Sequence, residues 1–369
     1  MTAAVPATIA RREFTLDDEA VAAVGAAATQ LARLEQSLLS TGAVTSLAKS
    51  LVRSEAVASS RIEGLQLSQQ RLARAAYGPA GGRSDPRAAE ILANVEALEQ
   101  AVELGASAQP IAVSRIEDIH KTLLRFTFDQ SIAGVVRQRQ NWVGGNDYHP
   151  LDAAYVPPPH EYVEPLLEDL CEFIERDDLA PVIQAAIAHA QFETIHPFAD
   201  GNGRVGRALV HAILRRRGAT PEYVPPISLV LAAEPRAYIS GLVDYREGRV
   251  SDWCALFSSA TARATENAIK LGTDTEALQT RWIDQLGSPR GDATVRRIVE
   301  VLPSQPVIDV GAGQRLTGKS HVSVGKALDQ LEEAGILRRL NERKWGRLWE
   351  CEELLQLATD FEVQVSAPS

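Results

Sequence analysis

The chain has 369 residues, more than one compact domain usually contains, which predicts two or three structural units. Hydrophobic residues make up 45% of it and charged residues 23%, an ordinary globular balance that argues against extensive disorder. The formal net charge of -10 argues against non-specific binding of nucleic acid or membrane by the whole molecule.

The first expected unit, residues 1–84, is a helical N-terminal region. Ala, Leu and Val recur at helical spacing from Asp17 to Leu51, and the pattern continues to Ser59 without a strong breaker. The segment from Tyr77 to Pro86 is dense in glycine and proline, which predicts a loop or linker.

The second expected unit, residues 85–285, is a helical bundle. Apolar residues recur at helical spacing from Ala88 to about Gly272, as is typical of helices with one buried face. The exception lies between Gly134 and Pro159, where short apolar pieces alternate with glycines and end in three prolines. This pattern predicts a small β-hairpin set on the helices.

The third expected unit, residues 286–369, follows a composition break at Gly287 to Gly291. A helix from Ser323 to Ala334, then a strand from Gly335 to Leu340 and a turn near Lys344, is the pattern of a winged helix-turn-helix. The predicted fold class is therefore mainly all-α, with a small hairpin and a C-terminal winged helix-turn-helix domain.

Cysteine usage and hydropathy bear on the compartment. The cysteines at positions 171, 254 and 351 form no CxxC pair, so neither a zinc cluster nor a disulfide scaffold is indicated. No stretch is long and apolar enough for a signal peptide or a membrane span. We therefore expect a cytoplasmic protein without a membrane partner.

The most informative segment is HPFADGNGRVGR, from His196 to Arg207. Pro197 discourages helix at His196, while Gly201 and Gly203 allow a tight turn and leave backbone amides uncovered. A helix from Arg204 to Arg217 follows, and the free amides and dipole of a helix N-terminus attract phosphate. The segment predicts an anion-binding cradle.

Charged side chains complete this predicted cradle. Arg204 and Arg207 lie three residues apart, so both can reach phosphate oxygens with forked donors. Asp200 offers an oxygen ligand of the kind Mg²⁺ prefers, and His196 can remove a hydroxyl proton near neutral pH. Each residue alone has an ordinary structural explanation, but their combination within one turn indicates phosphate chemistry.

This segment resembles the signature of Fic-domain proteins, His-Pro-Phe-x-Asp/Glu-Gly-Asn-Gly-Arg-x-x-Arg, at every defined position. The resemblance extends to residues 134–137 and 155–159, which are similar to the flap of that family, and to Tyr238 and Trp253. It implies a protein adenylyltransferase that moves AMP from ATP to a Ser, Thr or Tyr hydroxyl of a target protein or of itself. The flap would pair with an extended target segment by strand addition.

The resemblance also implies residue roles. His196 would be the catalytic base, the attacked α-phosphorus would lose pyrophosphate, and Asp200 would hold Mg²⁺ between the α- and β-phosphates. For Tyr238, lining the adenine pocket and filling the core are equally weighted. The residues implied to bind ATP are Gly201, Asn202, Gly203, Arg204, Gly206, Arg207 and Tyr238.

An upstream segment, residues 59–64, resembles the inhibitory motif Ser/Thr-x-x-x-Glu-Gly/Asn of the family. Ser59 and Glu63 are four residues apart and so share a helix face. The resemblance implies that Glu63 pairs with Arg207 and occupies the space of the γ-phosphate, which misplaces ATP for in-line attack. Spacing alone favours a solvated carboxylate near a helix end that Gly64 terminates.

Three functions stay open at this point. They are an AMP transferase, an enzyme of the same fold that removes AMP or transfers a phosphoryl group, and a nucleotide-gated regulator that binds DNA through its tail. Phosphotransferase relatives tend to carry lysine where this chain has Gly203, which favours AMP transfer. Removal of AMP would use Glu63 to activate water.

The tail carries two weaker signals. Residues 313–320 match the phosphate-loop pattern GxxxxGKS/T, but the further strands that such a loop needs are not evident, so we expect a coincidence. Nearby acidic residues dilute the basic face, so a contact with protein, such as a homodimer or the target, is favoured over DNA. The residues that would contact a DNA backbone are Arg338, Arg339, Arg343, Lys344 and Arg347.

Overall fold

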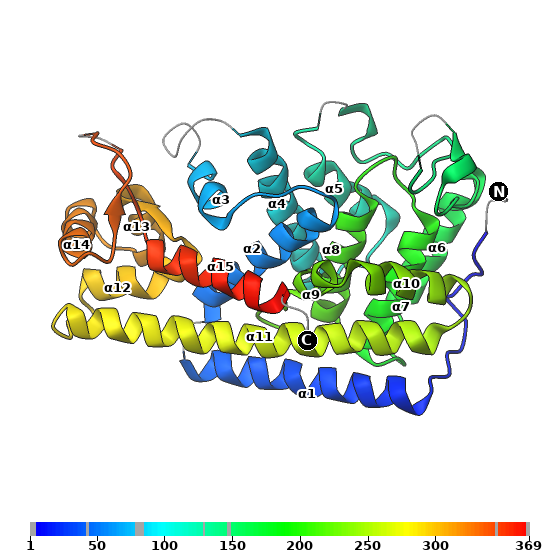
Figure 1. Cartoon of the computed structure of the whole chain (residues 1–369), viewed down its shortest axis with the longest axis horizontal. Helices are drawn as coiled ribbons and strands as arrows, with labels where there is room; N and C mark the ends of the chain where they lie inside the picture. Colours follow the sequence, from blue (N-terminus) through cyan, green and yellow to red (C-terminus); the bar gives the residue numbers. More distant parts are fainter. Residues whose placement is uncertain are drawn as a thin grey trace.

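The computed structural model describes residues 5–41, 44–77, 85–127, 130–145, 149–343 and 346–366, which are mainly helical (Figure 1). The mainly all-α fold class predicted from the sequence is confirmed. The N-terminal and central helices are α1 (Asp18–Thr41), α2 (Val44–Ile62), α3 (Gln69–Ala75), α4 (Pro86–Ala106), α5 (Val113–Leu123), α6 (Val163–Ile174), α7 (Pro181–Ile195), α8 (Asn202–Arg216), α9 (Ile227–Ala233), α10 (Pro235–Arg246) and α11 (Val250–Gln285). The tail contains α12 (Thr294–Val301), β1 (Val307–Asp309), α13 (Val310–Thr317), α14 (His321–Glu333), β2 (Arg338–Arg339), β3 (Leu348–Glu350) and α15 (Glu352–Ser366).

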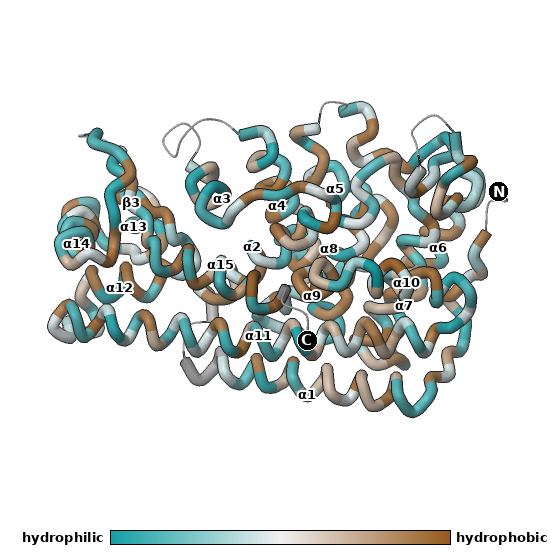
Figure 2. The backbone as a smooth tube through the Cα atoms, viewed as in Figure 1, coloured by the Kyte–Doolittle hydropathy of each residue, from teal (hydrophilic) through white to brown (hydrophobic). Residues whose placement is uncertain are grey.

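One hydrophobic core joins the N-terminal and central helices. It extends from Ile9 to Leu271 and also takes in Phe361 and Val365 of α15. Helix α7 runs through its middle and is buried from residue 184 to 195 without interruption. Figure 2 shows the apolar segments gathered around α7, α9 and α10, while α1 lies along α11 at one edge of the molecule (Figure 1). The expected first and second units therefore share one core.

The tail has a smaller core of its own, built around Trp282, Ile298, Leu328 and Trp349. Its three strands form an antiparallel sheet in the order β1-β3-β2, with Trp349 opposite Ile308 on one side and Arg339 on the other. Helices α13 and α14 pack beside the sheet and are joined by residues 318–320.

The phosphate-loop alternative for residues 313–320 is wrong. Strand β1 passes directly into α13, so no loop separates strand from helix, and Gly313 lies inside that helix. A Cβ on Gly313 would lie 2.5 Å from Cγ1 of Val324, so this glycine allows α13 and α14 to approach closely. A phosphate cradle needs a free loop of backbone amides, which this arrangement does not provide.

The predicted hairpin between Gly134 and Pro159 is also wrong in extent. Among the described residues of this flap, the pairing consists of a single antiparallel bridge between Val143 and Tyr155, and residues 146–148 lie outside the description. A side chain supplies a contact where a hairpin would have backbone hydrogen bonds, since Gln140 Nε2 donates to the Pro157 carbonyl at 2.9 Å. Prolines 157–159 also lack the N–H that a strand requires. Separately, no described helix meets the length and hydropathy that crossing a bilayer requires.

Candidate active site

His196 stands at the C-terminal end of α7 in a left-handed conformation, with φ 50° and ψ 60°. Residues other than glycine rarely adopt this conformation unless their surroundings hold them in it. Arg137 does so from the flap, because its Nε donates to the His196 carbonyl at 2.9 Å and its Nη2 donates to the Pro158 carbonyl at 2.6 Å. Burial lowers the pKa of Arg137 to about 10, which still leaves it charged at neutral pH.

The loop after His196 is shaped by Asn202. Its Oδ1 accepts from the Phe198 amide at 2.8 Å and its Nδ2 donates to the Phe198 carbonyl at 2.8 Å. Each end of this amide thus makes one hydrogen bond to Phe198, and Asn202 is only 2% exposed, so the side chain folds the loop; its contact with phosphate stays a prediction. Gly201 follows with φ 77° and caps α8 at its N-terminus.

His120 on α5 supports the same loop and was missed by sequence reasoning. Its Nδ1 accepts from the Gly134 amide at 3.0 Å, so Nε2 carries the hydrogen and donates to the Asp200 carbonyl at 3.0 Å. Burial lowers the pKa of His120 to about 4, which keeps this arrangement in place at neutral pH. The signal in the sequence was a histidine on the apolar face of an amphipathic helix, which reads equally as a core residue.

Two charged residues with different exposures flank the start of α8. The Asp200 side chain is 59% exposed, whereas that of Arg204 is 5% exposed, and their nearest charged atoms are 3.7 Å apart. Nε of Arg204 is buried with no hydrogen-bond partner among the described residues. Because the first amides of a helix also lack intrahelical acceptors, this position combines several unused donors.

The site offers few protein ligands for a metal. No group of three or more His, Cys, Asp and Glu side chains that could hold an ion occurs within the described ranges. Asp200 alone places an exposed carboxylate at the cradle, with Oδ1 accepting from the Gly201 amide at 2.6 Å. This donor set fits Mg²⁺ in the manner usual with nucleotides, through one or two carboxylates together with substrate phosphates.

Arg207 is held by both predicted inhibitory residues at the end of α2. Its Nη2 lies 2.7 Å from Oε1 of Glu63 and 2.9 Å from the Ser59 carbonyl, and its Nε donates to Oγ of Ser59 at 2.9 Å. Burial would raise the pKa of Glu63, but the charge and hydrogen bond of Arg207 outweigh it and lower the pKa. A Cβ on Gly203 would lie 2.1 Å from Glu63 Oε1, so the carboxylate sits directly against the cradle.

The imidazole of His196 lies against a second carboxylate. Burial and the charge of Arg137 lower the pKa of His196 to about 4, so it is neutral and able to accept a proton. Its Nδ1 is buried without a hydrogen-bond partner in the described part of the chain and lies 3.9 Å from Oε2 of Glu193. Burial raises the pKa of Glu193 to about 7.

Tyr238 and Gly206 lie behind the cradle. Tyr238 is 5% exposed, and its hydroxyl is 2.7 Å from Nε2 of His189 on α7. A Cβ on Gly206 would lie 3.0 Å from both Phe192 and Glu193, so this glycine allows α8 to pack closely against α7. These positions are those of core residues, and a direct contact of either residue with a nucleotide stays a prediction.

A cavity of about 380 Å³ lies beside the end of α7. Tyr155 of the flap, Thr194 of α7 and Arg246 of α10 line it, and the Arg246 guanidinium lies 4.1 Å from the centre of the Tyr155 ring. Arg246 is close enough to His196 for its charge to lower the pKa of that imidazole. Sequence reasoning missed Arg246 and Thr194, because their approach depends on how α10 packs on α7.

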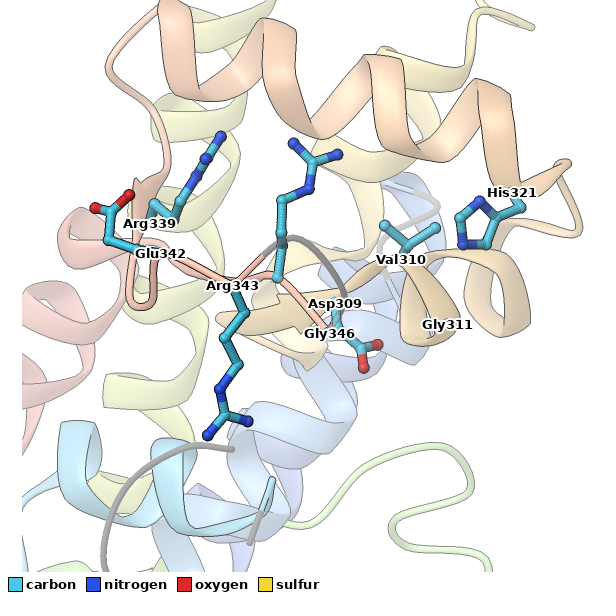
Figure 3. A pocket seen from close by; sticks show the side chains of 9 residues that line it. Asp309, Val310, Gly311, His321, Arg339, Glu342, Arg343 and Gly346 are labelled. Atoms are coloured by element: carbon cyan, nitrogen blue, oxygen red, sulfur yellow. The ribbon is translucent and has the colours of Figure 1, made fainter. Parts of the chain in front are cut away.

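A separate cavity of about 510 Å³ lies in the tail between α13, the start of α14 and the turn after β2 (Figure 3). Two arginines at its edge are already paired, Arg339 with Glu332 at 2.8 Å and Arg347 with Asp329 at 2.6 Å. Arg338 pairs with Glu350, Arg343 is exposed, and Lys344 lies outside the described residues. Most of the arginines proposed for DNA contact are thus neutralised within the tail.

Comparison with known proteins places these features in a family. The Fic/DOC family matches residues 110–214, and the Fic/DOC family N-terminal region matches residues 21–103. The protein adenylyltransferase fic-1 of Caenorhabditis elegans is 32% identical over 118 residues, which is 31% of this chain and 21% of that protein. A probable protein adenylyltransferase of Aquifex aeolicus is 35% identical over 99 residues, which is 27% of this chain and 28% of that protein. The matched part thus spans less than a third of these relatives.

Solved structures show the same fold at low sequence identity. A Fic family protein from Desulfovibrio desulfuricans G20 has a TM-score of 0.58 at 20% identity, covering 92% of this chain and 97% of that one. A Fic domain containing signaling protein from Bacteroides thetaiotaomicron has a TM-score of 0.53 at 21% identity, covering 66% of this chain and 97% of that one. With the two family matches over the N-terminal and central helices, the HPFADGNGRVGR segment at the start of α8 and this shared fold, the chain belongs to the Fic/DOC family.

Proposed function

We propose that this protein transfers AMP from ATP to a Ser, Thr or Tyr hydroxyl of a target protein and of itself. One observation carries the proposal: a neutral, fixed imidazole at His196 stands beside a helix N-terminus that bears two buried arginines, Arg204 and Arg207. The curated relatives, named protein adenylyltransferases, support the same reaction class.

The chemistry follows from the placement of these groups. Nε2 of His196 accepts the proton of the target hydroxyl, whose oxygen then bonds to the α-phosphorus while the bond to the pyrophosphate oxygen breaks. Pyrophosphate leaves with that electron pair, and AMP stays on the target. The α8 amides and Arg204 stabilise the phosphate charge that develops, as preorganised donors do in other transfer enzymes. Asp200 would hold Mg²⁺, which when bound supplies charge neutralisation between the phosphates.

We infer that the cavity beside α7, which is lined by Thr194 two residues before His196, receives the nucleoside part of ATP. Its volume of about 380 Å³ falls in the range of small-ligand pockets. The Tyr155 ring offers a face against which a purine can stack, and the Arg246 guanidinium lies over that face. We therefore infer that a bound nucleotide displaces Arg246 from Tyr155.

The site is expected to be restrained in the absence of a signal. Glu63 satisfies the Arg207 guanidinium and lies against Gly203, so a carboxylate stands where a terminal phosphate would settle. A nucleotide can then occupy the cavity and the α8 amides while its γ-phosphate is displaced. Such displacement moves the α-phosphorus out of line with the hydroxyl, and errors of about 1 Å can cost on the order of 100-fold in rate.

The decisive experiment incubates the protein and its Glu63→Gly variant with Mg²⁺ and ATP labelled at either the α- or the γ-phosphate. We expect the α-label to be retained on protein, and more of it in the Glu63→Gly variant. The double variant that also carries His196→Ala should retain none. Retention of γ-label alone would indicate a phosphotransferase. Absence of either label from the variant, tested with candidate targets present, would refute the proposed transfer.

A further inference from the structure

Helix α15 reaches back from the tail to the segment that carries Glu63. In Figure 1 it crosses the molecule between the tail and α9, and Phe361 and Val365 are buried in the main core. Glu362, only 8% exposed, accepts a hydrogen bond from Arg61 through Oε2 and another from Gln69 through Oε1. One carboxylate therefore joins residues on both sides of Glu63.

The local backbone explains why the hydrogen bonds of Glu362 with Arg61 and Gln69 restrain the position of Glu63. Helix α2 ends at Ile62, and Gly64 follows with φ 81°, its amide donating to the Arg61 carbonyl at 2.9 Å. The Leu65 amide donates to the Ser60 carbonyl at 3.0 Å, which completes a helix-ending turn around Glu63. Arg61 belongs to this turn, and Gln69 begins α3. The two hydrogen bonds of Glu362 thus hold together the two ends of the loop formed by residues 62–68.

A second buried carboxylate fixes the far end of α3. Glu350 of β3 is 0% exposed and accepts from Arg74 twice, from Nε at 2.8 Å and from Nη2 at 2.7 Å. Tyr77 adds a hydrogen bond to the Val307 carbonyl at 2.8 Å. Around these contacts lies a small apolar cluster formed by Ala73, Val307, Leu348 and Leu355.

These contacts leave the loop as the movable part. Residues 54–60 of α2 are buried, and Nδ2 of Asn94 on α4 donates to Oγ of Ser60 at 3.0 Å, so this part of the helix is fixed in the core. The Glu63 side chain is 36% exposed and, within the described part of the chain, accepts a hydrogen bond from Arg207. How often it leaves Arg207 therefore depends on the restraint of the loop by α15.

We propose that Glu362, supported by Glu350, is a positioning residue through which the C-terminal tail keeps Glu63 on Arg207. Movement of α15 away from α3 would free the anion site without any change at the site itself. The inference deepens the proposed AMP transfer and rests on it, since it names what controls the restraint. It couples α15 of the tail to the anion site at Arg207, although α15 contributes no residue to the cradle, and such coupling between separate sites is allosteric.

The test compares labelling by α-labelled ATP in single and double variants. Glu362→Ala is expected to raise self-labelling by roughly five- to tenfold, a change that corresponds to about 1–1.4 kcal/mol. In a Glu63→Gly background the same change is expected to alter labelling less than about twofold, because the restrained group is gone. Arg61→Gln should act in the same direction as Glu362→Ala.

Glu353→Ala is the matched control. Glu353 lies on the same helix, but it accepts from Arg281 at 2.7 Å and from Trp282 at 2.6 Å, both on α11. Its loss should lower the melting temperature of the tail about as much as Glu362→Ala while leaving labelling at the wild-type level. A general loosening of the tail would raise labelling in both variants and would overturn the proposal.

Amide hydrogen exchange provides a readout that does not require activity. Exchange in peptides covering residues 61–69 should become faster in Glu362→Ala and remain unchanged in Glu353→Ala. Unchanged exchange there would overturn the inference, as would equal labelling of Glu362→Ala and wild type. If Glu63→Gly takes up no α-label, the AMP-transfer proposal fails instead, and the exchange result still decides whether α15 restrains the loop.

Discussion

Replacing Glu63 with glycine leaves a buried positive charge with less compensation. Arg207 is 3% exposed and would keep its two contacts with Ser59, but it would lose its only carboxylate partner within hydrogen-bonding distance among the described residues. Breaking a fully buried ion pair costs about 3–5 kcal/mol. Because the Glu63 side chain is 36% exposed, solvent screening reduces this to about 1–2 kcal/mol.

This cost is measurable as a fall in melting temperature. For domains of 150–250 residues, about 1 kcal/mol corresponds to roughly 2–4 °C, so the variant should melt a few degrees below wild type. A nucleotide should reverse the loss, since its phosphate can replace the carboxylate at Arg207. Ligand at about 100 times its Kd stabilises a protein by about 2.7 kcal/mol.

The assay is thermal unfolding with and without Mg²⁺ and a non-hydrolysable ATP analogue. We expect the analogue to raise the melting temperature of Glu63→Gly by several degrees more than that of wild type. Glu63→Gln, which keeps an acceptor without the charge, should fall between them. If Glu63→Gly and wild type have the same melting temperature, and the analogue raises both by the same amount, then Glu63 does not compete with phosphate at Arg207.

Three further outcomes are expected. His196→Ala should lose α-label transfer by about 10²–10⁴-fold while its analogue-induced thermal shift stays near that of the parent, because a base acts on a proton and not on affinity; an equal loss of binding would contradict this. With Glu193 at a pKa of about 7 beside Nδ1 of His196, labelling should rise as pH passes upward through 7, because ionised Glu193 favours the imidazolium that forms. Labelling by Glu193→Gln should not change between pH 6 and 8, since the pKa of His196 is about 4. An inflection near pH 7 that persists in this variant would exclude the coupling of Glu193 to His196. Asp200→Asn should raise the Mg²⁺ concentration needed for half-maximal labelling by on the order of tenfold, whereas an unchanged titration would remove Asp200 from metal binding.

The sequence predicted the parts of the candidate site that have local causes. Proline at 197 and glycine at 201 can be read as an interrupted helix and a tight turn without any tertiary knowledge, and α7 ends at Ile195 accordingly. Helix α8 begins two residues before the expected Arg204, so Gly203, expected in the turn, lies in its first turn. The same reasoning placed Ser59 and Glu63 on one helix face; α2 ends at Ile62, one residue before Glu63, and both residues contact Arg207. Spacing within a helix is set by its geometry, so such predictions need no partner.

Tertiary placement could not be predicted in the same way. His120, Arg137 and Arg246 reach the site from α5, the flap and α10, and their side chains read in the sequence as ordinary helix or loop residues. Asn202 was assigned to phosphate because its type suits it, and nothing in the sequence indicated that both ends of its amide also bond to Phe198. A motif gives residue types, whereas hydrogen-bond satisfaction decides which of them remain available to a ligand.

The contacts of Arg207 suggest how this one residue would serve both the proposed inhibition and the proposed binding of ATP. A buried guanidinium is stabilised by an anion, so in the proposed exchange a phosphate would compensate Arg207 in place of Glu63, whose partly exposed carboxylate would then be left to solvent. Ser59 holds the guanidinium through Oγ and the backbone carbonyl, contacts that do not involve Glu63 and that we expect to persist when a phosphate binds. One anion, the Glu63 carboxylate, belongs to the protein, and the other, a phosphate, belongs to the nucleotide. In the proposal, the restraint on residues 62–68 therefore sets how often Glu63 occupies Arg207. In the proposal above, that restraint comes from contacts with the tail, away from the cradle, so regulation could change without altering the residues that carry out the chemistry.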